Sequence, residues 1–224
     1  PVARAWDQQR QFVADASHEL KTPLTSISGI AEIMKNGIML PADVPHFAGK
    51  IYDESQRLIT LIGDIIKLSQ LDEQSVPFAW EAVNLLELAE DVQKRLQSVC
   101  EKRKIAFQVT GTPCAVQGVR QVLDEMVYNI SENAIKYNRE AGSITVTTGY
   151  KEQHPFIRVT DTGIGIPKAE QERVFERFYR VDKSHSKAVG GTGLGLSIVK
   201  HGAILHHATI HLDSTEQVGT TIEI

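Results

Sequence analysis

The chain has 224 residues, 42% of them hydrophobic, and a formal net charge of -4. This length allows one large domain or two small ones with proper cores, and the negative balance argues against nucleic acid as a partner, because binding to phosphate backbones draws on an excess of Lys and Arg. No apolar run is long enough to cross a bilayer, and the first residues resemble neither a signal peptide nor a transit peptide. Cys100 and Cys114 form no paired motif, so we expect two unbridged, non-catalytic thiols.

The first predicted element is an amphipathic helix that ends near residue 34. Residues 1–11 show no start signal, so we expect the helix to continue from a preceding segment. Apolar residues recur at steps of three and four and predict one buried stripe. The stripe comprises Phe12, Ala16, Leu20, Leu24, Ile27, Ala31 and Met34. His18 falls opposite the stripe, on the solvated face that also carries Asp15 and Thr22. Pro23 predicts a bend just beyond His18. An ordinary surface histidine on such a helix is the alternative.

A second helix follows a turn that is rich in helix breakers. Pro45 is well placed to enter this helix, and apolar residues keep helical spacing from about Phe47 to Leu71. Two antiparallel helices with one stripe each cannot bury that surface alone, so we predict a homodimeric four-helix bundle. In the alternative arrangement, the stripes pack against the rest of the same chain. Pro77 interrupts the helical pattern, which predicts a hairpin domain over residues 1–73, a linker over 74–81 and a second domain over 82–224.

The second domain mixes helices and strands without strict alternation. The predicted helices are Leu85–Lys102, Val119–Ala134 and Gly193–Leu205, and the predicted strands are Ile105–Val109, Cys114–Gln117, Ile144–Tyr150, Phe156–Asp161, Thr209–Asp213 and Thr220–Ile224. This order favours an α+β sandwich with helices on one face of a mixed sheet. The predicted fold class is therefore a helical hairpin followed by an α+β domain.

Polar residues gather on one flank of the predicted helix at 119–134. Asn129, Asn133 and Lys136 share this flank on a helical projection. Amide oxygens suit Mg²⁺, a hard cation that keeps several waters and bridges to phosphates, and the lysine can answer phosphate charge. The alternative is a set of surface amides with no ligand.

Two glycine-containing segments complete the candidate site. Asp161 directly follows a strand and can accept a hydrogen bond from an exocyclic amine, while Gly163 and Gly165 let the backbone approach a flat ring. The same residues also make a good turn. The run Gly-Gly-Thr-Gly-Leu-Gly-Leu at 190–196 opens a helix, where free N–H groups can bind phosphate. The spacings match neither a P-loop nor a Rossmann motif, and the protein-kinase signatures are absent, so a less common way of holding ATP remains.

Six motifs in one order resemble the catalytic core of bacterial sensor histidine kinases over nearly the whole chain. They are Ser17–Leu24 (H box), Asn129–Tyr137 (N box), Asp161–Ile166 (G1 box), Phe175–Tyr179 (F box), Gly191–Leu196 (G2 box) and Gly219–Thr221 (the last box). The resemblance implies a dimerisation and histidine phosphotransfer hairpin, followed by the ATP-binding sandwich that DNA gyrase also has. The run Phe178–Lys183 most resembles kinases of the phosphate-sensing PhoR type. His206-His207-Ala208 departs from the His-Gly-Gly that is commoner in the family, which leaves the geometry of that turn open.

The resemblance also implies chemical roles in the hairpin. His18 would accept the phosphoryl group, Glu19 would orient the ring and take its proton, and Thr22 would orient water in a phosphatase reaction. Phospho-His18 would pass its group to an aspartate on the receiver domain of a response regulator. The family further implies a homodimer and the cytoplasmic portion of a membrane-anchored receptor, with the membrane reached only through an N-terminal sensor segment outside this chain.

For the second domain the resemblance implies an ATP site with Mg²⁺. The residues implied to hold ATP are Asn129, Asn133, Lys136, Tyr137, Asp161, Gly163, Gly165, Arg180, Gly191, Thr192, Gly193, Leu194, Gly195 and Thr220. Asp161 would read the adenine with help from Thr220, and Asn133 would bind the metal with support from Asn129. Arg180, in an ATP lid between Glu176 and Gly191, would reach the γ-phosphate.

Two other functions compete with this reading. One is an ATP-binding scaffold in which His18 is not phosphorylated, and the other is an ATP hydrolase of the wider superfamily. Asn129 stands where the hydrolysing relatives carry a glutamate base, which argues against hydrolysis. An exposed His18 argues against a pure scaffold.

Overall fold

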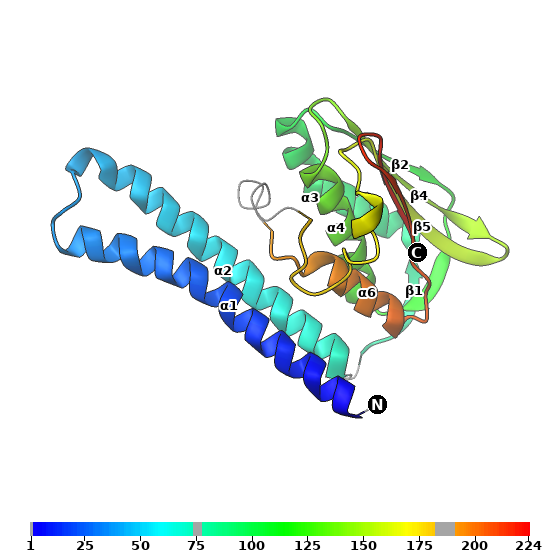
Figure 1. Cartoon of the computed structure of the whole chain (residues 1–224). Coiled ribbons are helices and arrows are strands. Elements are labelled where there is room, and N and C mark those ends of the chain that lie inside the picture. The colour runs from blue at the N-terminus through cyan, green and yellow to red at the C-terminus, as the bar shows by residue number, and fades with distance from the viewer. Residues whose placement is uncertain (1, 74–77, 182–190) are drawn as a thin grey trace.

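The computed structural model describes residues 2–73, 78–181 and 191–224 and has two parts, a long helical hairpin and an α/β sandwich (Figure 1). Residues 74–77 of the predicted linker and 182–190 of the predicted ATP lid lie outside the described residues. The turn of the hairpin lies far from the sandwich, and the opposite end of the hairpin packs against it (Figure 1). No helix among the described residues is both long enough and apolar enough to span a membrane.

The hairpin consists of α1 (Val2–Lys35) and α2 (Val44–Glu73), joined through the 3₁₀ turn η1 (Pro41–Asp43). Both helices therefore occur where the apolar periodicity predicted them. Helix α1 continues without interruption through Pro23, which is buried.

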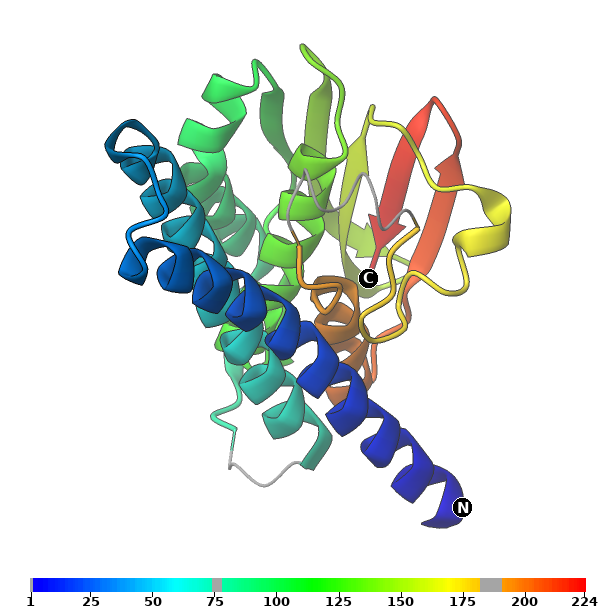
Figure 2. The same ribbon diagram turned by 60° about the vertical axis from the view of Figure 1, so that its left-hand side comes forward.

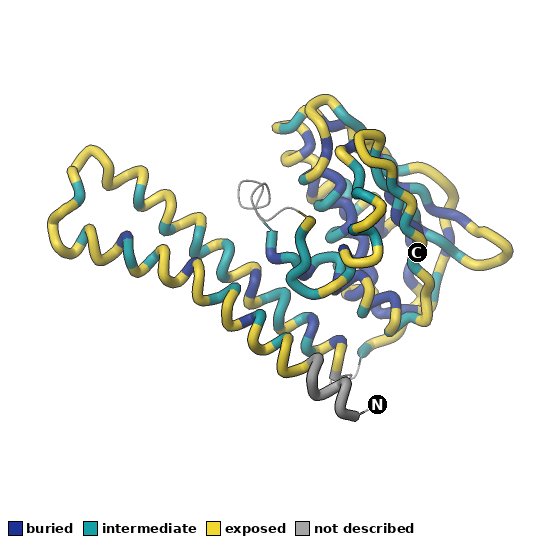
Figure 3. Tube along the Cα trace, in the orientation of Figure 1, coloured by how far each residue is buried: buried dark blue, intermediate teal, exposed yellow. Residues whose placement is uncertain are grey.

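The apolar stripes of the hairpin are only partly buried within one chain. Leu61, Leu68 and Leu71 of α2 are buried, and α2 packs against α6 (Gly195–Leu205) of the sandwich. A second set of large apolar side chains is between 47% and 63% exposed, and it comprises Leu24, Ile59, Ile62 and Ile66. Most of the hairpin away from the sandwich is exposed (Figure 3). Part of the α2 stripe thus packs within the chain, as the alternative interpretation held, and the remainder is free to pair with a second copy.

The sandwich contains two sheets and three described helices. Its elements are β1 (Glu81–Asn84), α3 (Leu85–Lys102), β2 (Ala106–Gly111), β3 (Ala115–Gly118), α4 (Arg120–Lys136), β4 (Ser143–Lys151), β5 (His154–Asp161), η2 (Lys168–Glu170), α6, β6 (His211–Thr215) and β7 (Gly219–Glu223). The large sheet has the strand order β2-β4-β5-β7-β6, in which β2 and β4 are parallel and the other neighbours antiparallel. Helices α3, α4 and α6 cover one face of this sheet (Figures 1 and 2). The predicted α+β sandwich is confirmed.

Strand β1 was not predicted from the sequence. It has four residues, pairs antiparallel with β3 in a separate two-stranded sheet, and begins at Glu81, the last residue of the predicted linker. Only Val83 of these four residues is buried. A strand of four residues with one buried side chain is too short to show an alternating pattern. Pairing with β3 rather than local periodicity therefore defines it.

One continuous core lies between the three helices and the large sheet. Side chains with less than 2% exposure come from each layer, and they include Leu88, Val92, Met126, Ile144, Val146 and Ile198. Helix α4 contributes its apolar face to this core, so the flank that carries its amides and lysine stays at the edge of the buried surface. The core therefore fixes the orientation of the predicted nucleotide residues on α4.

The turn after α6 keeps the geometry of a glycine turn although it contains His207. His207 has φ +54°, in the left-handed region, and the Ala208 N–H donates to the Ala203 carbonyl oxygen at 2.9 Å, which closes the helix end. His206 connects this turn to α4, because its Nε2 accepts from the Val119 N–H at 2.9 Å. Burial lowers the pKa of His206, which favours the neutral ring that can accept this bond.

His207→Gly is expected to stabilise the protein by about 1 kcal/mol, because glycine has no Cβ penalty in the left-handed region. The measurement is the free energy of unfolding from urea titration. Ala208→Gly is the control; its φ is not positive, so added backbone freedom should leave stability unchanged or lower it by about 0.5–1 kcal/mol. Equal destabilisation in both variants would contradict the strained conformation assigned to His207.

Candidate functional site

His18 lies on the exposed face of α1, as the phase of the apolar stripe predicted. One turn later, the Thr22 hydroxyl donates to the His18 carbonyl oxygen at 3.3 Å. The neighbouring Glu19 carboxylate is held from two sides. Its Oε2 lies 3.8 Å from Arg57 Nη2 on α2 and accepts from Arg180 Nη2 of the sandwich at 3.2 Å. An accessible imidazole therefore sits beside a carboxylate whose position is fixed by two guanidinium groups.

Asp161 lies at the end of β5, where its carboxylate is partly withdrawn from water. Its strand pairs with β7 so that Asp161 lies opposite Thr220, and the Gly163 N–H donates to Asp161 Oδ1 at 2.7 Å. Burial raises the pKa of Asp161, against the lowering effect of the backbone N–H groups of Gly163 and Thr220. The Thr220 hydroxyl lies 2.8 Å from the hydroxyl of Ser214. A desolvated acceptor flanked by hydroxyls is suited to a planar ring with an exocyclic amine.

The loop after Asp161 is tied to the end of α4. The Ile164 N–H donates to the Tyr137 carbonyl oxygen at 3.0 Å. Gly165 has φ +69°, and a Cβ there would lie 2.2 Å from the Thr215 carbonyl oxygen, so the position requires glycine. Tyr137 is partly exposed beside this loop. Burial raises its pKa, and the charge of Arg180 opposes that rise only in part. Asp161, Gly163, Gly165 and Tyr137 are therefore adjacent in space.

The glycine loop before α6 lies against the polar flank of α4. A Cβ on Gly195 would lie 2.7 Å from Asn129 Oδ1, and a Cβ on Gly191 would lie 3.3 Å from Lys136 Nζ. Gly193 lies against the backbone of Phe178, and Leu194 is buried at the start of α6. The absence of side chains thus brings the loop N–H groups close to the amides and the ammonium of α4.

The amides of α4 fit a magnesium ion that is shared with phosphates. Asn129 Nδ2 donates to the Glu125 carbonyl oxygen at 2.8 Å, which leaves Oδ1 facing the glycine loop. Asn133 lies one turn further along the same flank and is partly exposed. Within the described ranges no group of three or more His, Cys, Asp or Glu residues could hold a metal ion. A few neutral oxygen donors suit Mg²⁺, which keeps most of its waters and binds largely through phosphate oxygens.

Two predicted ATP residues also contact the hairpin. Arg180 was predicted to reach the γ-phosphate, and its guanidinium donates to Glu19. The Thr192 hydroxyl donates to Asp64 Oδ2 of α2 at 2.7 Å. Arg177 likewise contacts the hairpin, because it donates to Asp72 Oδ2 of α2 at 2.6 Å. The remaining predicted residues lie around one site between α4, the end of β5 and the start of α6.

Two hairpin carboxylates at this contact, Asp64 and Asp72, were given no role from the sequence. Asp64 and Asp72 flank the buried Leu68 at steps of four, so all three share one face of α2. That spacing was the available signal for a contact with the sandwich. Carboxylates interleaved with an apolar stripe, however, usually mark the solvated edge of a helix. Their role depends on the sandwich that packs on them.

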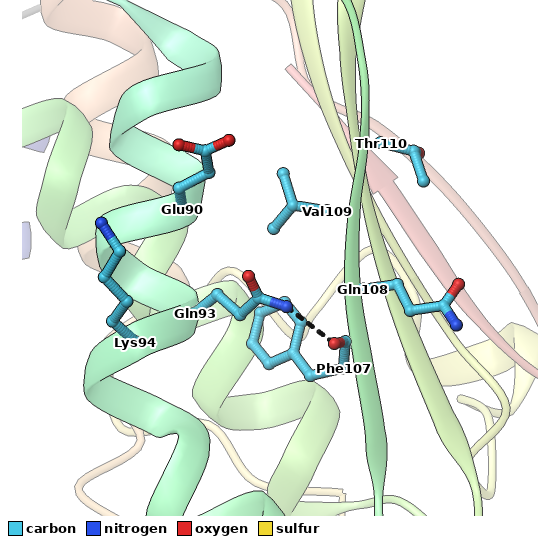
Figure 4. A pocket seen from close by; sticks show the side chains of 7 residues that line it. All are labelled: Glu90, Gln93, Lys94, Phe107, Gln108, Val109 and Thr110. Carbon is cyan, nitrogen blue, oxygen red and sulfur yellow. Dashed lines mark hydrogen bonds between the residues drawn. The ribbon is translucent and has the colours of Figure 1, made fainter.

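A separate hollow lies between α3 and β2, at the edge of the large sheet (Figure 4). Gln93 Nε2 donates to the Phe107 carbonyl oxygen across it at 2.8 Å. None of the predicted ATP residues lines this hollow. It therefore plays no part in the candidate site.

Comparison with protein families gives two matches. Residues 8–74 match the family described as "His Kinase A (phospho-acceptor) domain", and residues 118–224 match the family described as "Histidine kinase-, DNA gyrase B-, and HSP90-like ATPase". The first match contains His18 and the second contains all the predicted ATP residues. The first match lies within the hairpin region and the second within the sandwich, and residues 75–117 belong to neither match.

Individual relatives agree with these matches. The sensor-like histidine kinase SenX3 of Mycolicibacterium smegmatis is 38% identical over 223 residues, 99% of this chain and 58% of its own length, so this chain spans less than two thirds of that relative. The solved mycobacterial sensor histidine kinase MprB has a TM-score of 0.56 and 32% identity over 65% of this chain and 95% of its own. The histidine kinase ThkA, solved in complex with response regulator protein TrrA, has a TM-score of 0.76 and 23% identity over 99% of this chain and 63% of its own, which is a likeness of fold.

Proposed function

Because the chain belongs to the histidine kinase family, we propose that it transfers the γ-phosphoryl group of ATP to His18 and then to an aspartate of a response regulator. The observation that supports this most is the place of Arg180. Burial raises the pKa of Tyr137 against the lowering effect of the Arg180 charge, and the Arg180 guanidinium donates to Glu19 beside His18. One cation therefore links the nucleotide site to the phospho-accepting face.

In the proposed reaction the unprotonated nitrogen of the His18 ring attacks the γ-phosphorus. A phosphorus–nitrogen bond forms, the bond to the bridging oxygen of ADP breaks, and Glu19 takes up the proton from the ring. Such a transfer depends on positioning and on neutralising charge rather than on covalent help from the protein.

The residues around the candidate site would position ATP for this step. Asp161 would accept from the adenine amine, and Lys136 with the loop N–H groups would face the phosphates. Asn133, supported by Asn129, would hold Mg²⁺, which when bound neutralises phosphate charge. Asn129 is an amide, which cannot act as a general base for water. The site is therefore built for transfer to His18 rather than for hydrolysis.

The experiment is incubation of the protein with MgATP labelled in the γ-phosphate. Phosphohistidine is lost in acid and survives alkali, so we expect acid-labile, alkali-stable label on the chain. Label that survives acid would contradict the assignment, and an absence of any label would leave the scaffold alternative standing.

The proposed partner is the receiver domain of a response regulator. The structural neighbour ThkA was solved with such a protein. His18 is exposed on the hairpin, where a second protein can reach it. Purified phospho-protein should lose its label to a receiver domain from the same organism, and a receiver whose phospho-accepting aspartate is changed to Asn should take none.

Thr22→Ala is expected to leave phosphorylation of His18 intact and to slow dephosphorylation of the regulator by at least about tenfold. The reason is that Thr22 lies one turn past His18 and would orient the water that attacks the phosphoaspartate. The measurement is the decay of phosphorylated receiver with and without the kinase. Thr25→Ala, which changes an exposed threonine on the same helix, is the control. Unchanged decay with Thr22→Ala would remove the phosphatase role.

We also propose a homodimer formed through the exposed apolar side chains of the hairpin. Leu24, Ile59, Ile62 and Ile66 are available for pairing into a four-helix bundle. Sedimentation should give twice the chain mass for this protein and the chain mass for a variant with Ile59 and Ile66 changed to Glu. The membrane anchor that the family implies would belong to a part of the protein outside this chain, and fractionation of the full-length protein would test that.

A further inference from the structure

Three carboxylates of the hairpin hold groups of the sandwich that border the nucleotide site. Glu19 accepts from Arg180, Asp64 accepts from Thr192, and Asp72 accepts from Arg177 at 2.6 Å. Asp72 Oδ1 also lies 2.8 Å from His201 Nδ1 of α6. Apart from Glu19, these carboxylates have no role in the proposed phosphoryl transfer.

Asp64 is a partly buried carboxylate in this contact. It lies on α2 between the buried Leu61 and Leu68 and is itself only partly exposed. Burial raises its pKa, and the Thr192 hydroxyl and the charge of Lys67 oppose that rise. A carboxylate in such a place loses hydration, and the bond from Thr192 compensates only in part.

Thr192 is fully engaged in this arrangement. Its hydroxyl donates to Asp64 at 2.7 Å and accepts from the Leu194 N–H at 3.2 Å. The residue belongs to the glycine loop, whose N–H groups would face the phosphates of ATP. A triphosphate brought to this loop would therefore approach the negative charge of Asp64, and it would find the Thr192 proton already donated.

We propose that Asp64 competes with the triphosphate of ATP for the Thr192 end of the glycine loop, so that the docked hairpin lowers the affinity of the sandwich for ATP and bound ATP weakens the docking. The inference rests on the proposed function, since it concerns regulation of the same site. Because the two binding equilibria are linked, the factor by which docking weakens ATP binding equals the factor by which bound ATP weakens docking. The same geometry frees Arg180 from Glu19 when the hairpin is released.

The test is calorimetric titration with a nonhydrolysable ATP analogue and Mg²⁺. Asp64→Asn keeps the shape of the side chain and removes its charge, and it should bind about tenfold more tightly than the unaltered protein, the scale expected for one charge contact near a protein surface. Asp64→Ala should tighten binding at least as much. Asp43→Asn is the matched control, because Asp43 is an exposed aspartate in the hairpin turn far from the sandwich, and its affinity should not change (Figure 1).

A second variant tests docking without touching a hairpin carboxylate. Lys67 Nζ lies 2.7 Å from Glu125 Oε1 across the same contact, so Lys67→Met should also tighten binding, by a smaller factor. Unchanged affinity in folded Asp64→Asn and Lys67→Met would overturn the inference, and labelling of His18 in those proteins would show that the proposed function stands. If neither they nor the unaltered protein bound the analogue, the proposed function itself would fail.

Discussion

Replacing His18 with glutamine is expected to lower the label transferred from γ-labelled MgATP by at least about a thousandfold, to background. Glutamine has nearly the length of histidine, but its amide nitrogen is not a nucleophile. Because His18 is exposed, the change should leave folding and ATP binding unaffected. The measurement is labelled chain after separation under alkaline conditions, with affinity for the ATP analogue determined on the same preparation.

His46→Gln is the matched control for that result. His46 is another exposed histidine on the hairpin, at the start of α2. The His46→Gln variant should carry as much label as the unaltered protein. Label that persists in His18→Gln would place the phosphoryl group on another residue and would defeat the assignment of the accepting histidine.

Asn133→Ala is expected to weaken binding of the magnesium nucleotide by at least about tenfold, the effect commonly seen when metal-site residues are removed. The amide oxygen is lost, and the partly exposed position on α4 tolerates alanine. The measurement is titration with the ATP analogue in the presence of Mg²⁺ and again with the metal chelated. The difference between the two conditions should shrink in the variant.

Gln121→Ala serves as the control for Asn133, because it removes an exposed amide from the same helix. Sedimentation should show the same assembly state for both variants. An Asn133→Ala protein that keeps its affinity and its dependence on Mg²⁺ would show that this amide has no part in holding the metal.

The elements of this fold were predictable where periodicity is long. Both hairpin helices and Leu85–Lys102 follow from apolar stripes of several turns, and the described boundaries differ by few residues. Strand β1 could not be found, since four residues carry too little pattern and its partner β3 lies about thirty residues away along the chain. Likewise, no local signal shows which apolar residues of the hairpin face the sandwich.

The candidate site was predictable in its parts but not in its contacts. The phase of one stripe places His18 on the exposed face of α1, and the motif order brings Asp161 and the glycine loop to α4. The hydrogen bond from Arg180 to Glu19 was not predicted from the sequence. Asp64 reads as an ordinary polar residue of α2 until the sandwich packs on it. Such pairs form between elements distant in sequence, so spacing alone does not reveal them.

The central claim is that ATP bound in the sandwich gives its γ-phosphoryl group to His18 and not to water. A single-turnover experiment that measures ADP, free phosphate and phosphohistidine together tests it most directly. We predict one phosphohistidine at His18 for each ADP formed, with little free phosphate. Free phosphate equal to the ADP formed, with an unlabelled His18, would contradict the account and make the protein an ATP hydrolase.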